Sequence, residues 1–250
     1  MLEIKNLGVS FGGLRAVNDF NLYVGSNELI GLIGPNGAGK TTIFNLLTGV
    51  YQPTEGGITL NNESLYGKKT YMIAKKGISR TFQNIRLFKS LSVIDNVKIG
   101  MYSCYKYSIL DSIFKTKKYR QVEKNITKES LELLKIFDLD KYAKDVSSSL
   151  SYGKQRELEI VRALASHPKI LLLDEPAAGM NPNETINLMK LIKKIKNEFN
   201  LSIILIEHDM KLVMNVCERI IVLNHGEVLT SGSAKEILED KNVIKAYLGA

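Results

Sequence analysis

The sequence has little cysteine and no long apolar run, and these two absences exclude several classes of protein. Only two of its 250 residues are cysteines, Cys104 and Cys217, and they lack metal-ligand spacing, so neither a disulfide scaffold nor a zinc site is expected. No apolar run approaches the ~18 residues of a membrane-spanning helix. The alternating Leu2, Glu3 and Ile4 directly follow Met1, so we expect no signal peptide. A cytosolic, reduced protein is the expectation.

The composition is that of a globular protein with an excess of positive charge. Hydrophobic residues make up 44% and charged residues 24% of the chain, which excludes disordered and fibrous classes. The length suits one large domain, or a domain with a subdomain. The formal net charge of +8 indicates an anionic partner: a nucleotide, a nucleic acid or a membrane surface. Composition does not choose among these partners.

Strand and helix patterns alternate along the chain and predict an α/β fold. Short apolar runs at 29–33, 170–173 and 202–206 are typical of strands buried on both faces. The alternating residues of 20–24, and of other short segments in the first third, predict short half-buried strands. Alternation of strands and helices predicts a mostly parallel sheet covered by helices. Residues 84–165 show helical spacing without a convincing strand, so we interpret them as a helical insertion.

One stretch of the insertion, residues 101–130, is both basic and rich in tyrosine. It contains seven Lys or Arg residues against three Asp or Glu, and four tyrosines: Tyr102, Tyr105, Tyr107 and Tyr119. Two interpretations stay open for this stretch. It is either a solvated surface or a contact to lipid headgroups or to a membrane partner.

A phosphate-binding loop follows the apolar run at 29–33. Residues 34–41 match the pattern G-x-x-x-x-G-K-[ST]: Gly34, Pro35, Asn36, Gly37, Ala38, Gly39, Lys40 and Thr41. Thr42 follows directly and is expected to belong to the same nucleotide site. The motif opens a predicted helix, as it requires. Its backbone N–H groups and the helix N-terminus favour phosphates. Lys40 would neutralise the β- and γ-phosphates and Thr41 would hold Mg²⁺, so ATP and Mg²⁺ are the expected cofactors.

An acidic pair, Asp174 and Glu175, ends the apolar run at 170–173. Asp174 would act on Mg²⁺ through a water molecule, and Glu175 would polarise the attacking water as a general base. A carboxylate at a strand end can also be an ordinary helix cap. The phosphate loop at 34–41 favours the catalytic interpretation.

Three further motifs resemble those of the ATP-binding cassette (ABC) family. Residues 150–155, Leu-Ser-Tyr-Gly-Lys-Gln, resemble its signature motif and end nineteen residues before Asp174. Gln83, in Thr81-Phe82-Gln83, resembles the glutamine of its Q-loop, and His208, after the apolar run 203–206, its switch histidine. Order and spacing match over the whole chain. The resemblance therefore implies a single ABC ATPase domain over residues 1–250.

The resemblance also implies a division of the chain. Residues 1–83 and 166–250 would form a P-loop NTPase core of RecA type with an N-terminal antiparallel β subdomain. Residues 84–165 would form an inserted α-helical subdomain that contains the signature motif. Ser151, Gly153 and the helix that follows them would bind the γ-phosphate held by the opposite subunit, so that two chains sandwich two ATP molecules.

Individual roles follow from the same resemblance. Phe11 would stack on adenine, although a strand Phe is otherwise a core residue. Glu175, His208 and Gln83 would be catalytic. The alternative interpretation of His208 is a histidine of the core. Gln83 would also contribute to the metal site, together with Thr41 and Asp174.

Two departures from the wider family point to one branch of it. Tyr152 and Lys154 stand where many members have Gly and Gln, and Asn181 stands where many have Asp. Tyr152 and Asn181 are usual in the ATPases of branched-chain amino acid importers, and residues 10–17, 80–88, 173–179 and 207–214 resemble that branch too. Lys154 is less usual even there. It adds positive charge beside the expected phosphate site.

This branch implies an ATPase that drives amino-acid uptake from the cytoplasmic face of the membrane. The implied partners are a second ABC ATPase subunit in a homo- or heterodimer, two transmembrane permeases and an extracytoplasmic substrate-binding protein, with no nucleic acid expected. One alternative is the ATPase of another ABC transporter, such as one for lipopolysaccharide export. The other is a soluble ABC ATPase acting on nucleic acid or ribosomes. The sequence does not specify the transported solute.

Overall fold

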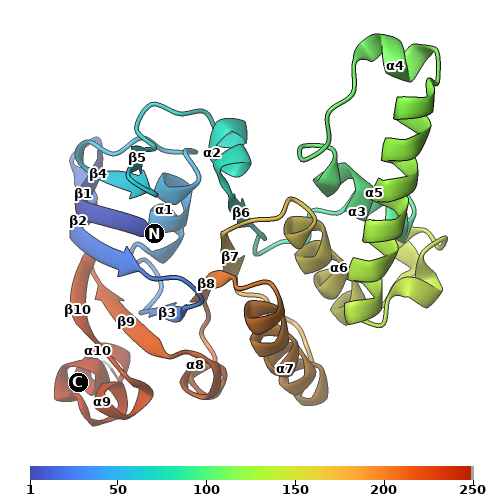
Figure 1. Cartoon of the computed structure of the whole chain (residues 1–250). Coiled ribbons are helices and arrows are strands. Elements are labelled where there is room, and N and C mark those ends of the chain that lie inside the picture. The colour runs from blue at the N-terminus through green and yellow to red at the C-terminus, as the bar shows by residue number, and fades with distance from the viewer. Residues whose placement is uncertain (249–250) are drawn as a thin grey trace.

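The computed structural model describes residues 1–248, which form two sheets and a projecting helical region (Figure 1). The last two residues of the predicted core segment 166–250, Gly249 and Ala250, lie outside the described residues. The α/β fold class predicted from the sequence is confirmed. The proposed division of the chain at residues 84 and 165 stays a prediction.

The larger sheet has the strand order β10-β9-β3-β8-β7-β6. Its strands are β3 (Leu29–Ile33), β6 (Ile78–Arg80), β7 (Ile170–Asp174), β8 (Ser202–Ile206), β9 (Arg219–Asn224) and β10 (Glu227–Gly232). All neighbours are parallel except β9 and β10, which confirms the predicted mostly parallel sheet. Every residue of β3, β7 and β8 is buried, as their continuous apolar runs predict.

The smaller sheet is antiparallel and has the order β2-β1-β4-β5. Its strands are β1 (Leu2–Phe11), β2 (Leu14–Val24), β4 (Glu55–Leu60) and β5 (Glu63–Ser64). The prediction of only short strands here is wrong, because β1 has 10 and β2 has 11 residues. The reason is an irregularity between Ile4 and Leu7 that breaks the alternation. There, Asn6 has φ +46° and its side-chain amide donates to Asp19 Oδ1 at 2.8 Å.

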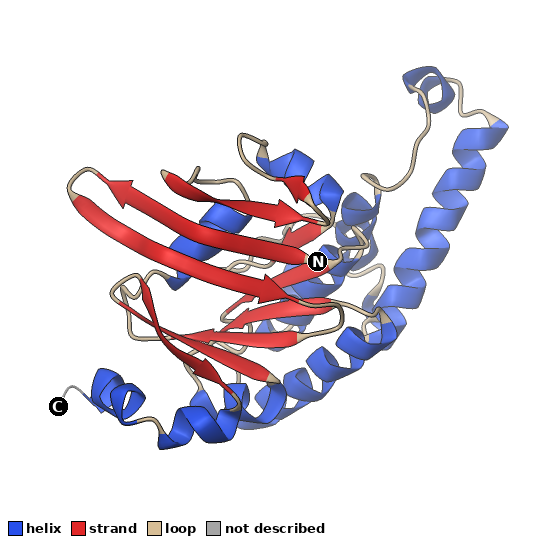
Figure 2. Cartoon of the chain, turned by 60° about the vertical axis from the view of Figure 1, so that its left-hand side comes forward, coloured by secondary structure: helices blue, strands red, loops and turns tan. Residues whose placement is uncertain are grey.

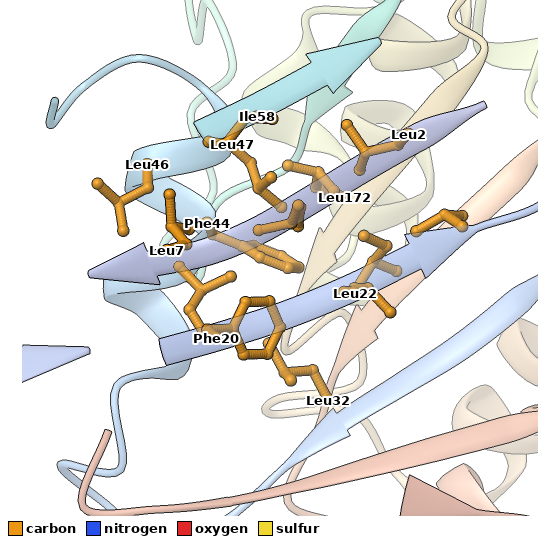
Figure 3. Packing of buried hydrophobic residues seen from close by; sticks show 14 of the residues in the cluster. Leu2, Leu7, Phe20, Leu22, Leu32, Phe44, Leu46, Leu47, Ile58 and Leu172 are labelled. Carbon is orange, nitrogen blue, oxygen red and sulfur yellow. The ribbon is translucent and has the colours of Figure 1, made fainter. Parts of the chain in front are cut away.

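The helix that follows the phosphate loop, α1 (Lys40–Leu47), lies between the two sheets. Figure 3 shows its side chains packed among those of both sheets. The buried cluster includes Leu2, Leu7, Phe20, Leu22, Leu32, Phe44, Leu46, Leu47, Ile58 and Leu172. Because α1 packs on both sides, the position of its N-terminus is set by the whole core.

The helical region projects from the sheets as one arm (Figures 1 and 2). It contains α3 (Val93–Met101), α4 (Ile109–Ile113), α5 (Lys117–Ile136), the 3₁₀ turns Asp140–Tyr142 and Ser147–Ser149, and α6 (Tyr152–Leu164). The short α4 caps the end of α5 farthest from the sheets. These helices all lie within residues 84–165, where the sequence predicts a helical insertion.

The remaining helices cover the larger sheet or its ends. They are α2 (Thr70–Lys76), α7 (Pro182–Glu198), α8 (Met210–Val216), α9 (Ala234–Glu239) and α10 (Lys241–Leu248). In α7, the buried apolar residues Leu188, Ile192 and Ile195 have helical spacing. Within residues 1–248, no helix is long and apolar enough to cross a membrane.

Candidate active site

An open cavity of about 440 Å³ lies at the N-terminus of α1. Segments from distant parts of the chain line it, and they include most of the residues predicted for nucleotide binding and catalysis. The lining residues are Leu14, Arg15, Ala16, Asn36, Gly37, Ala38, Gly39, Lys40, Thr41, Thr42, Gln83, Glu175, His208 and His225. The volume lies within the range usual for small-molecule sites.

The phosphate loop is closely packed, and two of its glycines are required. A Cβ on Gly34, which has φ +152°, would lie 2.3 Å from the carbonyl oxygen of Leu223. Gly39 has φ +101°, and a Cβ there would lie 2.9 Å from the carbonyl oxygen of Ala16. The tight loop therefore depends on residues without a side chain.

Lys40 is folded back onto the loop that precedes it. Its Nζ donates to the carbonyl oxygens of Gly34 at 2.7 Å and Pro35 at 2.9 Å. Burial lowers the pKa of Lys40, and the nearby carboxylates of Glu175 and Asp174 oppose that change. The ammonium group is thus held beside the cavity by groups that an anionic ligand can replace.

Gln83, Glu175 and His208 meet at one edge of the cavity. Gln83 Nε2 donates to Glu175 Oε2 at 2.9 Å, and His208 Nε2 lies 2.7 Å from Glu175 Oε1. Glu175 has φ +49°, and its N–H donates to Ile206 O at 2.9 Å. The carboxylate is therefore fixed on both oxygens by the two side chains that the sequence assigns to the same reaction.

Glu207 fixes the backbone next to His208, and the sequence analysis missed it. It is buried and accepts hydrogen bonds from the N–H groups of Ala177 at 2.8 Å and His208 at 3.2 Å. Burial raises the pKa of Glu207, and these two hydrogen bonds oppose the rise. Its only sequence signal is its place at the end of an apolar run, directly before His208.

Asp174 is not among the residues that line the cavity, and it pairs with Arg80, a second residue that no motif in the sequence singles out. Arg80 Nη2 donates to Asp174 Oδ2 at 2.6 Å, and its Nη1 donates to Asn45 Oδ1 of α1 at 2.7 Å. The Arg80 guanidinium lies between the rings of Phe44 and Phe82, at 5.3 and 5.2 Å from their centroids. Arg80 thereby joins the acidic strand end to α1 and to the segment of Gln83.

Ser151 and Gly153 do not line the same cavity as the phosphate loop. They line a separate cavity of about 510 Å³ with Lys154, Glu157 and Glu184. Ser151 begins α6 without a side-chain capping bond, and a Cβ on Gly153 would lie 2.8 Å from Glu184 Oε1. A single chain therefore keeps the two predicted phosphate sites apart.

The residues that depart from the wider family have definite contacts. Lys154 Nζ lies 4.2 Å from the centroid of the Tyr142 ring. The Tyr152 ring packs against Gly179, where a Cβ would lie 3.0 Å from it. Asn181 caps α7, because its side chain accepts from the N–H groups of Asn183 and Glu184.

A buried ion pair connects the signature helix α6 to the segment of Gln83. Arg156 donates to the carbonyl oxygen of Phe82 at 2.6 Å and also to that of Gln83. Its partner Glu159, at 3.2 Å, accepts from the N–H of Arg86 at 3.1 Å. Movement of α6 is therefore coupled to the backbone that carries Gln83.

Phe11 lies outside the cavity lining. It is 43% exposed at the end of β1 and packs edge-on against Tyr51, with ring centroids 5.0 Å apart. Leu14, Arg15 and Ala16, which follow in the β1–β2 hairpin and its second strand, reach the cavity instead. The adenine-stacking role of Phe11 stays a prediction.

The residues of the cavity fit a nucleotide and its metal ion. The loop supplies backbone N–H groups, a helix N-terminus and Lys40, which suit phosphates. Among the described residues, no group of three or more His, Cys, Asp or Glu side chains could hold a metal. Thr41, Gln83 and Glu175 line the cavity, and their hydroxyl, amide and carboxylate oxygens are donors of the kind that Mg²⁺ takes together with substrate phosphates.

The fold and this cavity define an ATPase of the P-loop class. The profile of the ABC transporter family matches residues 17–178. The chain belongs to this family, and its activity is that of an ABC transporter ATPase.

Relatives of known name are similar over the whole chain. The high-affinity branched-chain amino acid transport ATP-binding protein BraF of Pseudomonas aeruginosa is 45% identical, covering 100% of this chain and 98% of BraF. LivG of Escherichia coli, with the same description, is 44% identical with the same coverage. The lipopolysaccharide export system ATP-binding protein LptB of Escherichia coli is 34% identical, covering 99% of this chain and 97% of LptB.

Solved structures of cassettes have the same fold. The ADP conformation of MJ1267, an ATP-binding cassette of an ABC transporter, superimposes with a TM-score of 0.87 at 28% identity. The similarity covers 100% of this chain and 99% of MJ1267. The nucleotide-binding character that the sequence predicts is thus confirmed at the level of the family.

Proposed function

We propose that this chain is the ATP-binding subunit of an importer for branched-chain or related amino acids. The observation that carries most weight is the full-length identity of 44–45% with BraF and LivG, against 34% with LptB. The difference favours import over lipopolysaccharide export.

The chemistry of the site supports ATP hydrolysis by the chain's own residues. Lys40 and the loop N–H groups would bind the phosphates. Thr41 and Gln83 would hold the metal ion, and Asp174 would act on it through a water molecule. Mg²⁺, when bound with the nucleotide, supplies charge neutralisation at the phosphates. Glu175 takes a proton from the attacking water, and Gln83 and His208 keep its carboxylate in position.

The separation of the two phosphate sites supports a working dimer. Ser151 and Gly153 of one subunit bind the γ-phosphate held by the loop of the other, so each ATP is bound between two chains. The second ATPase subunit is either another copy or a related chain. This chain lies on the cytoplasmic face of the membrane, where closure of the dimer moves two transmembrane permeases. An extracytoplasmic binding protein delivers the solute to them.

The general-base assignment is tested by Glu175→Gln in the reconstituted transporter. We expect steady-state ATP turnover to fall by about 10²- to 10⁴-fold while ATP binding persists, since the amide cannot accept the proton. Unchanged turnover would remove Glu175 from the mechanism.

The importer assignment is tested by co-purification. A tagged Glu175→Gln chain, extracted from native membranes in mild detergent with ATP, should bring two multi-span permeases and a second ATPase. Ribosomes, nucleic acid or no membrane protein would overturn the transport role and leave the ATPase chemistry intact.

A further inference from the structure

The short helix α4 (Ile109–Ile113) lies at the tip of the arm (Figures 1 and 2). Its apolar side chains are exposed to solvent. The exposed fractions are 80% for Ile109, 64% for Leu110, 66% for Ile113 and 74% for Phe114. Their spacing along the helix, i, i+1, i+4 and i+5, places the four side chains on one face. Such a contiguous apolar patch on a protein surface is typical of an interaction site.

The geometry of the tip is fixed by local contacts. Ser108 and Asp111 form a capping box at the start of α4, and Asp111 also accepts from the Thr116 hydroxyl at 2.8 Å. These hydrogen bonds lower the pKa of Asp111. The carboxylate is therefore occupied within the turn, and the apolar face is presented on a defined helical turn.

The tyrosines of the arm serve its internal packing. Tyr102 and Tyr107 each donate to Glu123 of α5 at 3.4 Å, and Tyr107 packs edge-on against Tyr119. Tyr105 donates to Glu129, and burial, together with this bond, raises the pKa of Tyr105 to about 12. The tyrosine-rich part of residues 101–130 thus attaches the tip to α5, and a partner contact must be made by other residues.

Exposed positive charge flanks α4 in the sequence on both sides. Residues 106–120 contain five Lys or Arg and one acidic residue, Asp111. The five cations are exposed, and no ion pair within 4.0 Å is formed by any of them in the described part of the chain: Lys106, Lys115, Lys117, Lys118 and Arg120. Four exposed apolar side chains close to five cations complement a phospholipid bilayer. Its headgroup layer is anionic, and its acyl chains beneath that layer are apolar.

We propose that α4 is a membrane contact that inserts into the headgroup region of an anionic phospholipid bilayer. The four apolar side chains enter the boundary between headgroups and acyl chains, and the flanking lysines lie at the level of the phosphates. The positive charge of residues 106–120 favours an anionic bilayer over a second copy of the chain, because two such tips would bring like charges together. The proposal goes beyond the proposed transport function and does not depend on it.

The experiment is co-sedimentation of the purified full-length chain with vesicles. One set contains equal parts phosphatidylcholine and phosphatidylglycerol, and the other contains phosphatidylcholine alone. We expect binding to the anionic set that weakens as salt is added, since salt screens exposed charges. A sample without vesicles gives the fraction that sediments through self-association.

Two variants separate the apolar and electrostatic contributions. We expect Ile113→Asp/Phe114→Asp, and separately Lys117→Gln/Lys118→Gln, each to reduce the bound fraction roughly tenfold at low salt. Matched controls on α9 and α10, far from the tip, are Leu238→Asp, which replaces a side chain that is 60% exposed, and Lys235→Gln/Lys241→Gln. The controls should bind like the original chain, and ATP hydrolysis should be unchanged in all four variants.

Several results would overturn the proposal. These are absence of binding to anionic vesicles, equal losses in the controls, or a dimer that is lost with the apolar variant while vesicles do not bind. Loss of a co-purifying permease without any vesicle binding would make α4 a protein-docking site instead. Glu175→Gln should bind vesicles normally, so failure of the catalytic assignment and failure of the lipid contact are distinguishable.

Discussion

The nucleotide cavity and the tip of the arm differ in how far apart in the sequence the hydrogen-bonded partners of their charged groups lie. In the cavity region, Asp174 pairs with Arg80 from 94 positions away, and Glu175 bonds to Gln83 from 92 positions away. At the tip, Asp111 bonds to Ser108 and Thr116, both within five positions, and the flanking lysines are exposed.

This difference indicates how far the structural effect of a substitution should extend in each region. A change in the cavity region releases a buried charge and disturbs several segments, whereas a change at the tip alters only the surface that the tip presents. Stability measurements should therefore separate the two regions even before any activity is measured.

The largest effect is expected from Arg80→Leu. The side chains of Arg80 and Asp174 are 6% and 3% exposed, so the substitution leaves a buried, unpaired carboxylate. We expect a loss of about 3–5 kcal/mol in the free energy of unfolding, measured by urea denaturation without nucleotide.

The matched control is Arg15→Leu. Arg15 lies 2.6 Å from Glu55, the same distance as in the buried pair, but these side chains are 45% and 58% exposed. Its loss should cost less than about 1 kcal/mol. Equal losses in the two variants would mean that burial of the Arg80–Asp174 pair does not increase its contribution to stability.

Much of the site could be predicted because its signals are local. The loop 34–41 and the acidic pair Asp174 and Glu175 follow buried strands, so their geometry is set by the residues next to them in the chain. The signature at Ser151 likewise begins a helix that its own spacing predicts. Motif and structural context agree at each of these places.

The remainder depends on contacts that a single sequence does not display. Nothing in the segment of Arg80 indicates that its partner is Asp174, and nothing around Arg156 indicates the carbonyl of Phe82. The alternation of β1 is interrupted at Asn6, so the sequence pattern does not display the full length of this strand. Apolar residues such as Ile109 ordinarily predict burial, so exposure of α4 becomes visible only in the fold.

A smaller, pH-dependent effect is expected from Glu207→Gln. Burial raises the pKa of Glu207 in the folded chain, so the unfolded chain loses this proton at lower pH. Stability of the original chain should then fall as pH rises from the ordinary glutamate pKa through the raised value. The amide variant should lack this fall, which denaturation at a series of pH values would reveal. Parallel curves for the two proteins would contradict the assignment.

The smallest effect is expected from Phe114→Ala at the tip. Phe114 is 74% exposed, so the substitution removes little buried surface, and the free energy of unfolding should change by less than about 0.5 kcal/mol. The same substitution at Phe44, which is fully buried between the two sheets, should cost about 3–5 kcal/mol. Urea denaturation of both variants gives the comparison. A large loss at Phe114 would show that α4 supports the fold, and its exposed face would then no longer stand as a surface free for a partner.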